Sequence, residues 1–166
     1  MVTPLSGWKA GVEPWRPGTA PGPCLRAAWS VGRAGVVRIV GVDVLRISRL
    51  IDADVLTVLR ERGIVRGPVL LNGRRRCVEV LVRPGTASSW PEMPWTRCVD
   101  AAVMLCPAPS VTSASGLHVD GRVWITPPGY APPVTDADAL AEAVATALAR
   151  RVHLPSARGH ADQRRY

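Results

Sequence analysis

The sequence predicts a single α/β domain of the α+β type, with a central mixed or antiparallel sheet flanked by helices. The chain has 166 residues, of which 47% are hydrophobic, so one domain can bury a core without disulfides or a structural metal. Phenylalanine is absent and aromatic residues make up only 5%, so the core must be built mainly from Val, Leu, Ile and Ala. Short β-branched runs alternate with helical patterns, which favours a sheet covered by helices.

The strongest local signal is a β-hairpin over residues 67–85, GPVLLNGRRRCVEVLVRPG. Two apolar runs flank Asn72-Gly73, a pair that favours positive φ at both central positions of a type I′ turn. In the second run, three valines at alternate positions share one face that another element must cover: Val78, Val80 and Val82.

The region before the hairpin is predicted to hold an arm, a strand and a helix. Residues 1–34 form an irregular arm rich in Pro and Gly, with a short helix over residues 24–30. Trp8 and Trp15 in this arm either cap the core or stack on a base. Residues 35–45, GVVRIVGVDVL, predict a strand because they are dense in β-branched residues. Asp52 is placed to cap a helix over residues 53–62 that ends at Gly63.

The region after the hairpin is predicted to alternate between loops and short strands. Residues 84–94 form a loop with Trp90 and Trp95 at its far end. Residues 98–106, CVDAAVMLC, predict a buried strand that is apolar except for one Asp. A tight turn at Asp120-Gly121 precedes a short strand over residues 122–126.

The clearest helix comes near the end of the chain. Thr135 and Asp138 match a capping box, and apolar residues then recur every four positions to about Val152: Leu140, Val144 and Leu148. Residues 35–152 therefore make the predicted α/β domain, and residues 153–166 are a basic tail that is expected to be disordered.

The net charge of +8 suggests nucleic acid or another anionic surface as a partner, although a basic surface can also be simply solvated. Lys9 is the only lysine, and several of the arginines lie in the last stretch of the chain. Three more follow the predicted hairpin turn, where they suit either ligand contact or exposure to solvent: Arg74, Arg75 and Arg76.

The chain shows no targeting or membrane signal. No apolar run reaches the roughly 18 to 20 residues needed to cross a bilayer, and the N-terminus lacks the apolar core of a secretory signal. We therefore expect a cytoplasmic protein with no membrane partner. Its cysteines are then expected to be free thiols, and their spacing does not match a zinc site: Cys24, Cys77, Cys98 and Cys106.

Known catalytic motifs are missing from the sequence. It contains no Walker A motif, no dinucleotide-binding G-x-G-x-x-G after a strand, no G-x-S-x-G and no H-E-x-x-H. Asp43 and Asp100 stand out instead, because each lies inside a predicted apolar strand. A carboxylate in such a place is costly unless it pairs with an arginine or binds a divalent cation.

The order of these elements resembles the N-terminal domain of actinobacterial bifunctional DNA primase/polymerases of the archaeo-eukaryotic primase type. The resemblance covers residues 36–148. It rests on the GPV that begins the hairpin, the RPG that ends it, and the PAPS at residues 107–110, which is similar to that family's PPS.

The resemblance implies a primase/polymerase-like fold with an incomplete active site. The family's first motif is a pair of acidic residues one apart on a strand, and here Asp43 matches the first while Leu45 replaces the second. Asp100 matches the acidic residue of the third motif. The second motif carries a His that contacts nucleotide phosphates, whereas the matching stretch here, RRRCV, has none.

Three functions follow as hypotheses. The leading one is a catalytically degenerate domain that binds DNA or a nucleotide, with phosphates contacting Arg74, Arg75 and Arg76; no cofactor is certain for it. The alternative is an active nucleotidyltransferase in which Asp43 and Asp100 hold Mg²⁺ or Mn²⁺. The third is a protein-interaction module whose aromatic surface is formed by four tryptophans: Trp8, Trp15, Trp90 and Trp95.

Overall fold

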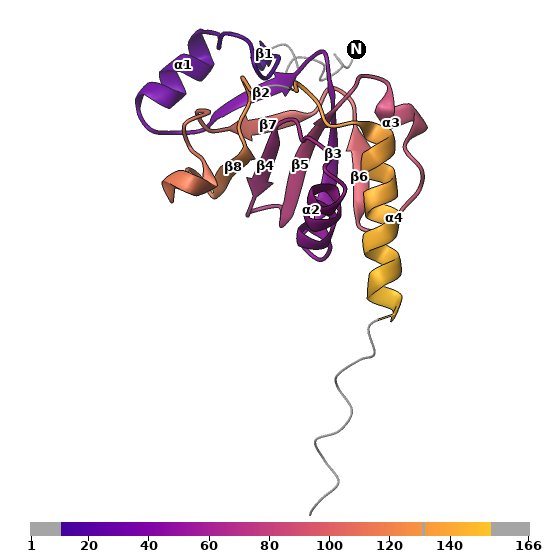
Figure 1. Cartoon of the computed structure of the whole chain (residues 1–166). Coiled ribbons are helices and arrows are strands. Elements are labelled where there is room, and N and C mark those ends of the chain that lie inside the picture. The colour runs from indigo at the N-terminus through magenta and orange to yellow at the C-terminus, as the bar shows by residue number, and fades with distance from the viewer. Residues whose placement is uncertain (1–10, 131, 154–166) are drawn as a thin grey trace, which may run out of the picture.

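Eight strands form two sheets in the computed structural model, which describes residues 11–130 and 132–153 (Figure 1). The five-stranded sheet has the order β6-β3-β5-β4-β8, and the three-stranded sheet has the order β1-β2-β7. The strands are β1 (Pro14–Trp15), β2 (Gly35–Ile39), β3 (Asp43–Ser48), β4 (Val69–Asn72), β5 (Cys77–Val82), β6 (Thr96–Val99), β7 (Val103–Cys106) and β8 (Arg122–Thr126). The helices are α1 (Pro23–Ser30), α2 (Asp52–Glu61), α3 (Thr86–Ser89) and α4 (Ala137–His153), with a 3-10 turn at Ser113–Ser115.

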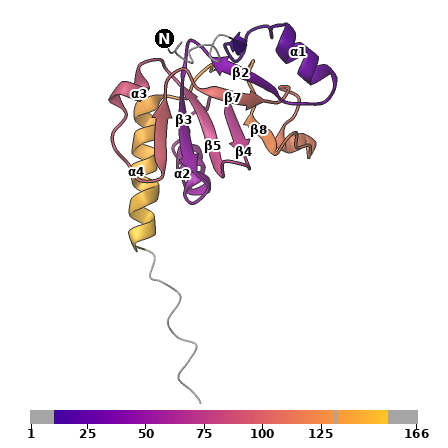
Figure 2. The ribbon, with the colours of Figure 1, turned by 180° about the vertical axis from the view of Figure 1, so that it is seen from behind.

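The molecule has three layers. Helices α2 and α4 cover one face of the five-stranded sheet, and α1 and the three-stranded sheet lie over the other (Figures 1 and 2). All strand pairs are antiparallel except β1 with β2. This arrangement confirms the predicted α+β class and the helix-covered sheet. In the part of the chain that is described, no helix is long and apolar enough to span a membrane.

The two longest apolar runs each cross from one sheet to the other. Residues 35–45 were expected to form one strand, but they divide into β2 and β3 around Gly41, whose φ is 76°. Residues 98–106 likewise divide into β6 and β7 around Ala101, whose φ is 45°. Both single-strand predictions are wrong, because an apolar run shows that a segment is buried but does not show where its backbone turns.

The bent segments pair with each other on both sides of their bends. Strand β2 pairs with β7 in the small sheet, and β3 pairs with β6 in the large one. The result is one antiparallel ribbon, bent in the middle so that its halves lie in different layers (Figure 2). The apolar residues enclosed between the two sheets include Leu81, Met104 and Trp124.

The predicted face of β5 is confirmed. Val78, Val80 and Val82 are fully buried with residues of α2 and α4, whereas Leu81 faces the core between the sheets. Alternation along the strand therefore serves two cores at once. This double burial explains why every residue of β5 is buried.

The hairpin forms, but its turn differs from the prediction. Asn72 pairs with Cys77, so the connection is a four-residue loop over residues 73–76 and not a two-residue turn at Asn72-Gly73. The positive φ falls on Arg76, at 53°, because Asn72 remains in the strand with its amide buried. The tight turn predicted at Asp120-Gly121 is confirmed: both residues have positive φ, and Val119 bridges to Arg122 across it.

Both main helices lie where the sequence predicts them, although their starts differ. Helix α2 ends before Gly63, whose φ of 67° is the expected left-handed stop, but Asp52 is the first helical residue and not the cap. In α4 the first-turn bond comes from Asp136, whose Oδ1 accepts from Ala139 N at 2.7 Å. Thr135 instead accepts from Gly67 N at 3.0 Å and so joins α4 to the sheet.

Part of the predicted irregular arm belongs to the core. Trp15 in β1 is only 3% exposed, and its ring meets that of Trp29 edge to face at 5.8 Å between centroids. Of the two alternatives for Trp15, capping the core therefore holds. Trp8 and the predicted tail beyond His153 lie outside the described residues.

Candidate functional site

A row of polar side chains crosses the face of the five-stranded sheet that the helices leave free. Strand register places Arg97 on β6 opposite Arg46 on β3, and Arg46 opposite Glu79 on β5. Asn72 on β4 is opposite Arg122 on β8. Residues directly opposite in antiparallel strands point to the same face. Glu79 is opposite Leu70 on β4, and Asn72 lies two positions further along that strand, so it points to the same face. Every strand of this sheet therefore contributes a polar side chain to the row.

The centre of this row is a buried hydrogen-bonded network. Glu79 is 1% exposed, and its Oε1 accepts from Nε of Arg46 at 3.1 Å. Its Oε2 accepts from Nδ2 of Asn72 at 3.3 Å. Asn72 Oδ1 in turn accepts from the backbone N–H of Arg75 at 3.1 Å. The carboxylate thereby connects a strand arginine with the hairpin loop.

A hollow of about 380 Å³ opens beside this network, and we call it the sheet hollow. It is lined by four arginines together with an aromatic ring and small polar side chains: Arg46, Arg75, Arg76, Arg97, Trp95, Ser48, Cys77 and Thr96. Trp95 is 47% exposed, and the guanidinium of Arg151 lies 5.9 Å from its ring centroid. In Figure 2 the small sheet lies over the ends of these strands that are farther from the hairpin loop.

A second hollow of about 420 Å³ lies against the same loop, and we call it the loop hollow. Its lining consists of Arg49, Leu71, Gly73, Arg76, His118 and Gly121. Arg76 lines both hollows, so they adjoin at this side chain. His118 reaches the site because Gly73 N donates to Gly121 O at 2.9 Å, which ties two turns together. Sequence reasoning missed His118, since 42 positions separate it from Arg76 and no motif joins them.

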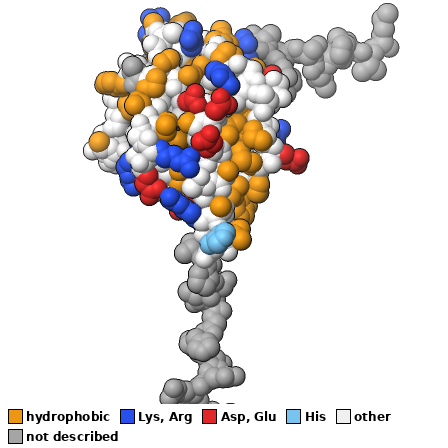
Figure 3. Space-filling model, turned by 45° about the vertical axis from the view of Figure 1, so that its right-hand side comes forward, with side chains coloured by type: hydrophobic (Ala, Val, Ile, Leu, Met, Phe, Trp, Pro, Cys, Tyr) orange, Lys and Arg blue, Asp and Glu red, His pale blue; other side chains and the backbone are white. Residues whose placement is uncertain are grey.

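The arginines of the site differ from those on the helix side in their pairing. Near α2 and α4, four arginines pair with carboxylates: Arg62 with Glu142, Arg83 with Asp138, Arg150 with Glu61, and Arg151 with Asp54. Figure 3 shows the side that carries α4, where acidic and basic side chains are interspersed. By contrast, Arg75, Arg76 and Arg97 form no ion pair with any residue in the described ranges.

Asp43 and Asp100, the predicted metal ligands, lie elsewhere. Asp43 is buried, and its Oδ2 accepts from Ala87 N at 2.8 Å at the start of α3. It pairs with no arginine among the described residues. Asp100 is exposed in the bend between β6 and β7 and not inside a buried strand, so that expectation is wrong. Within residues 11–130 and 132–153, no three His, Cys, Asp or Glu residues group closely enough to hold a metal.

The two sets of predicted site residues are separated along the sheet. Asp43 is opposite Val82 at one end of the β3–β5 pair, whereas Ser48 is opposite Cys77 beside the arginine loop. Five residue steps at about 3.3 Å each place these ends about 17 Å apart. The structure therefore brings Arg75 and Arg76 together with Arg46 and Arg97, and not with the two aspartates. Arg74, the other arginine predicted for the site, lies beside Gly121 and lines neither hollow.

The cysteine thiols of the sheet are poor nucleophiles. Burial, with the charge of Glu79 nearby, raises the pKa of Cys77 to about 11. Burial also raises the pKa of Cys98 to about 11, helped by Asp43 and Asp100, and raises that of Cys106 further. All four cysteines are free thiols, as predicted. A thiol at such a pKa carries almost no thiolate near neutral pH.

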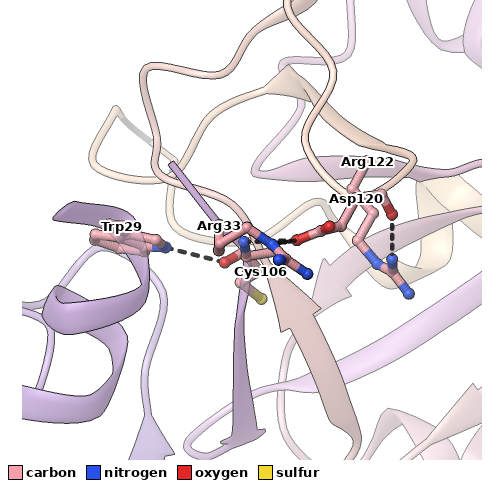
Figure 4. Close-up of polar contacts among 6 residues, drawn as sticks. Trp29, Arg33, Cys106, Asp120 and Arg122 are labelled. Atoms are coloured by element: carbon pink, nitrogen blue, oxygen red, sulfur yellow. Dashed lines mark hydrogen bonds and ion pairs between the residues drawn. The ribbon is translucent and has the colours of Figure 1, made fainter. Parts of the chain in front are cut away.

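The turn that carries His118 is held by a separate polar cluster (Figure 4). Asp120 Oδ2 accepts from Arg33 Nε at 3.2 Å and from Ala34 N at 3.0 Å. These bonds, led by the one from Ala34, hold the pKa of Asp120 below its ordinary value. Arg122 donates from Nη1 to the Asp120 carbonyl, while its buried Nε finds no partner in the described part of the chain.

The predicted aromatic surface is not continuous. Trp15 is in the core, and Trp90 is half-buried with its Nε1 donating to Thr96 Oγ1 at 3.1 Å. Of the three described tryptophans named for that surface, only Trp95 is exposed.

No protein-family model, curated protein or solved structure matches the chain.

Proposed function

We propose that the protein binds single-stranded DNA at the two adjoining hollows. The observation that carries this proposal is the convergence of Arg46, Arg75, Arg76 and Arg97 around an exposed Trp95. Arginine binds phosphate through charge-assisted, often bidentate hydrogen bonds. An exposed aromatic ring beside such a track is the usual platform on which a base stacks.

The pairing of the arginines supports phosphate binding over simple solvation. Near α2 and α4, carboxylates neutralise four arginines at 2.8 to 3.7 Å. At the sheet hollow, Arg75, Arg76 and Arg97 lie together, and no described carboxylate pairs with them. Like charges held together repel, so their clustering is best explained by an anion that completes the site.

The geometry favours a single strand over a duplex. The sheet hollow measures about 380 Å³, which suits one or a few nucleotides. An exposed ring can stack only on a base that is free of its partner strand.

Binding is better supported than nucleotidyl transfer. A catalytic site of that kind needs its metal ligands and its phosphate-binding groups at the same nucleotide. Here the aspartates and the arginine loop lie about 17 Å apart along the sheet by strand rise. This separation supports the hypothesis of a catalytically degenerate, primase/polymerase-like domain, and the family resemblance itself belongs to that proposal.

The test is fluorescence anisotropy with a labelled single-stranded oligonucleotide of about 16 nucleotides, long enough for the usual site sizes. We expect Arg75→Gln/Arg76→Gln to weaken binding at least about tenfold, because two phosphate contacts are lost. Arg26→Gln/Arg60→Gln is the matched control: it removes two exposed arginines that are outside both hollows.

Three outcomes would contradict the proposal. The first is that wild-type protein binds no single strand at low salt. The second is that the control variant loses as much affinity as the loop variant, which would show that only net charge matters. The third is tighter binding of RNA or duplex DNA than of single-stranded DNA in the same assay.

A further inference from the structure

We infer that Glu79 is a positioning residue that orients the arginines of the DNA site. The inference rests on the proposed function and deepens it. Glu79 is the only acidic residue in the polar row of the five-stranded sheet, and it pairs with Arg46, which lines the sheet hollow. A carboxylate at this position needs an explanation, because it repels the anionic ligand that the arginines attract.

The first arm of the network orients Arg46. Glu79 Oε1 holds the Nε of Arg46 at 3.1 Å from the directly opposite position on β5. The two terminal nitrogens of this guanidinium form no other hydrogen bond to the described residues, so they remain available where Arg46 lines the hollow. A guanidinium held at Nε presents these two nitrogens in a fixed plane that matches two phosphate oxygens.

The second arm orients the hairpin loop. Glu79 Oε2 accepts from the amide of Asn72, and the same amide's oxygen accepts from the backbone N–H of Arg75. Asn72 is 2% exposed, so its orientation is set by these bonds and not by water. One buried carboxylate therefore constrains two segments that are more than 25 positions apart: the guanidinium of Arg46 directly, and the loop backbone at Arg75 through Asn72.

Packing alone does not explain Glu79. The same face of β5 continues to Leu81 in the core between the sheets, and Leu70 is directly opposite Glu79 on β4. An apolar side chain would suit this position, and replacing a buried ion pair with apolar residues is often neutral or stabilising. Preorganising a binding site is a role that an apolar residue could not perform.

The direction in which Glu79→Gln changes the affinity for DNA distinguishes a positioning role of Glu79 from a purely electrostatic one. Glu79→Gln removes a negative charge from an anion-binding site, so a purely electrostatic role predicts tighter binding of DNA. If Glu79 acts by positioning, the same substitution weakens binding, because a neutral amide cannot accept strongly from both partners. We expect a loss of about tenfold, comparable to one charge-assisted hydrogen bond.

The experiment compares wild type, Glu79→Gln, Arg46→Gln and the double variant by anisotropy with the same labelled oligonucleotide. Thr135→Val serves as the control for stability: it removes an equally buried hydrogen bond, to Gly67 N, that is outside both hollows. Thermal melts give the folded fraction, and affinities are compared per folded molecule. We expect the loss caused by Glu79→Gln to shrink in the Arg46→Gln background, since one of its two arms is then already lost.

A measurement on the wild-type protein avoids any variant that fails to fold. In NMR spectra of the free protein, the Nε–H of Arg46 should exchange with water much more slowly than that of Arg76, which is exposed and forms no ion pair among the described residues. Equal exchange rates, or tighter binding by Glu79→Gln, would overturn the inference. If the wild-type protein binds no single-stranded DNA, the proposed function itself is wrong. If the wild-type protein binds and Glu79→Gln does not weaken binding, the proposed function stands, but Glu79 does not act as a positioning residue.

Discussion

Raising the salt concentration should weaken DNA binding. The size of the effect should depend on how many arginines of the two hollows contact phosphates. Each phosphate that an arginine neutralises releases condensed counterions, and for single strands the slope of log affinity against log salt is about −0.7 per contact. Arg75, Arg76 and Arg97 are without ion-pair partners in the described chain, whereas Arg46 and Arg49 already pair with Glu79 and Asp52. The count of contacts therefore lies between three and five.

These counts give a slope between about −2 and about −3.5. A fourfold increase in salt, from about 50 to about 200 mM, then lowers the affinity by about 20- to 130-fold. For Arg75→Gln/Arg76→Gln we expect the slope to become shallower by about 1.4, because two contacts are removed.

Anisotropy titrations at four or more salt concentrations measure this slope directly. Arg26→Gln/Arg60→Gln should keep the wild-type slope, since both side chains are outside the hollows. A wild-type slope near zero would refute phosphate contact altogether. An unchanged slope in the loop variant would show that the phosphates bind elsewhere.

Gly67→Ala should destabilise the fold by about 2 to 5 kcal/mol in urea unfolding, because its new Cβ would come within 2.5 to 2.8 Å of Val134 backbone atoms and also disturb a buried hydrogen bond. A loss under about 1 kcal/mol would contradict this close approach. The carboxyl of Asp120 has a lowered pKa, so the stability it adds is present above its ordinary value of 3.8 and is lost as the pH falls below it. The difference in melting temperature between wild type and Asp120→Asn should therefore shrink below about pH 4, and a constant difference would argue against the lowered pKa. Iodoacetamide near pH 8 should alkylate the exposed Cys24 well before Cys77, because Cys77 is buried and its pKa is about 11. Peptide mass spectrometry measures the order of alkylation, and modification of Cys77 before Cys24 would contradict its burial.

Much of the local structure could be predicted because it depends on short-range patterns. The period of apolar residues located α2 and α4, and a glycine with left-handed backbone ended α2 as expected. Alternation along β5 correctly placed three valines on one covered face, and the structure shows that α2 and α4 cover it. Errors arose where a backbone bends inside an apolar run, at Gly41 and Ala101, because both halves of each run are buried and the pattern does not change.

The candidate site was predicted only in part. Three consecutive arginines at the hairpin drew attention to the loop, and the structure places other arginines beside them. Arg46, Arg97 and His118 were not predicted as part of the site, since they reach it from other strands and turns. Asp43 and Asp100 remain predicted ligands that no observation tests, at the opposite end of the sheet.

Short-range patterns in the sequence are enough to predict most of the helices and strands, the apolar faces and where the arginines are concentrated. These properties follow from periodicity, β-branching and glycine stops, all of which act over a few residues. The tertiary structure alone decided that Arg97, Arg46 and Glu79 lie in one row, and that Trp95 borders the same hollow. Such neighbours depend on strand order and register, which are set by long-range packing and have no local trace in the chain.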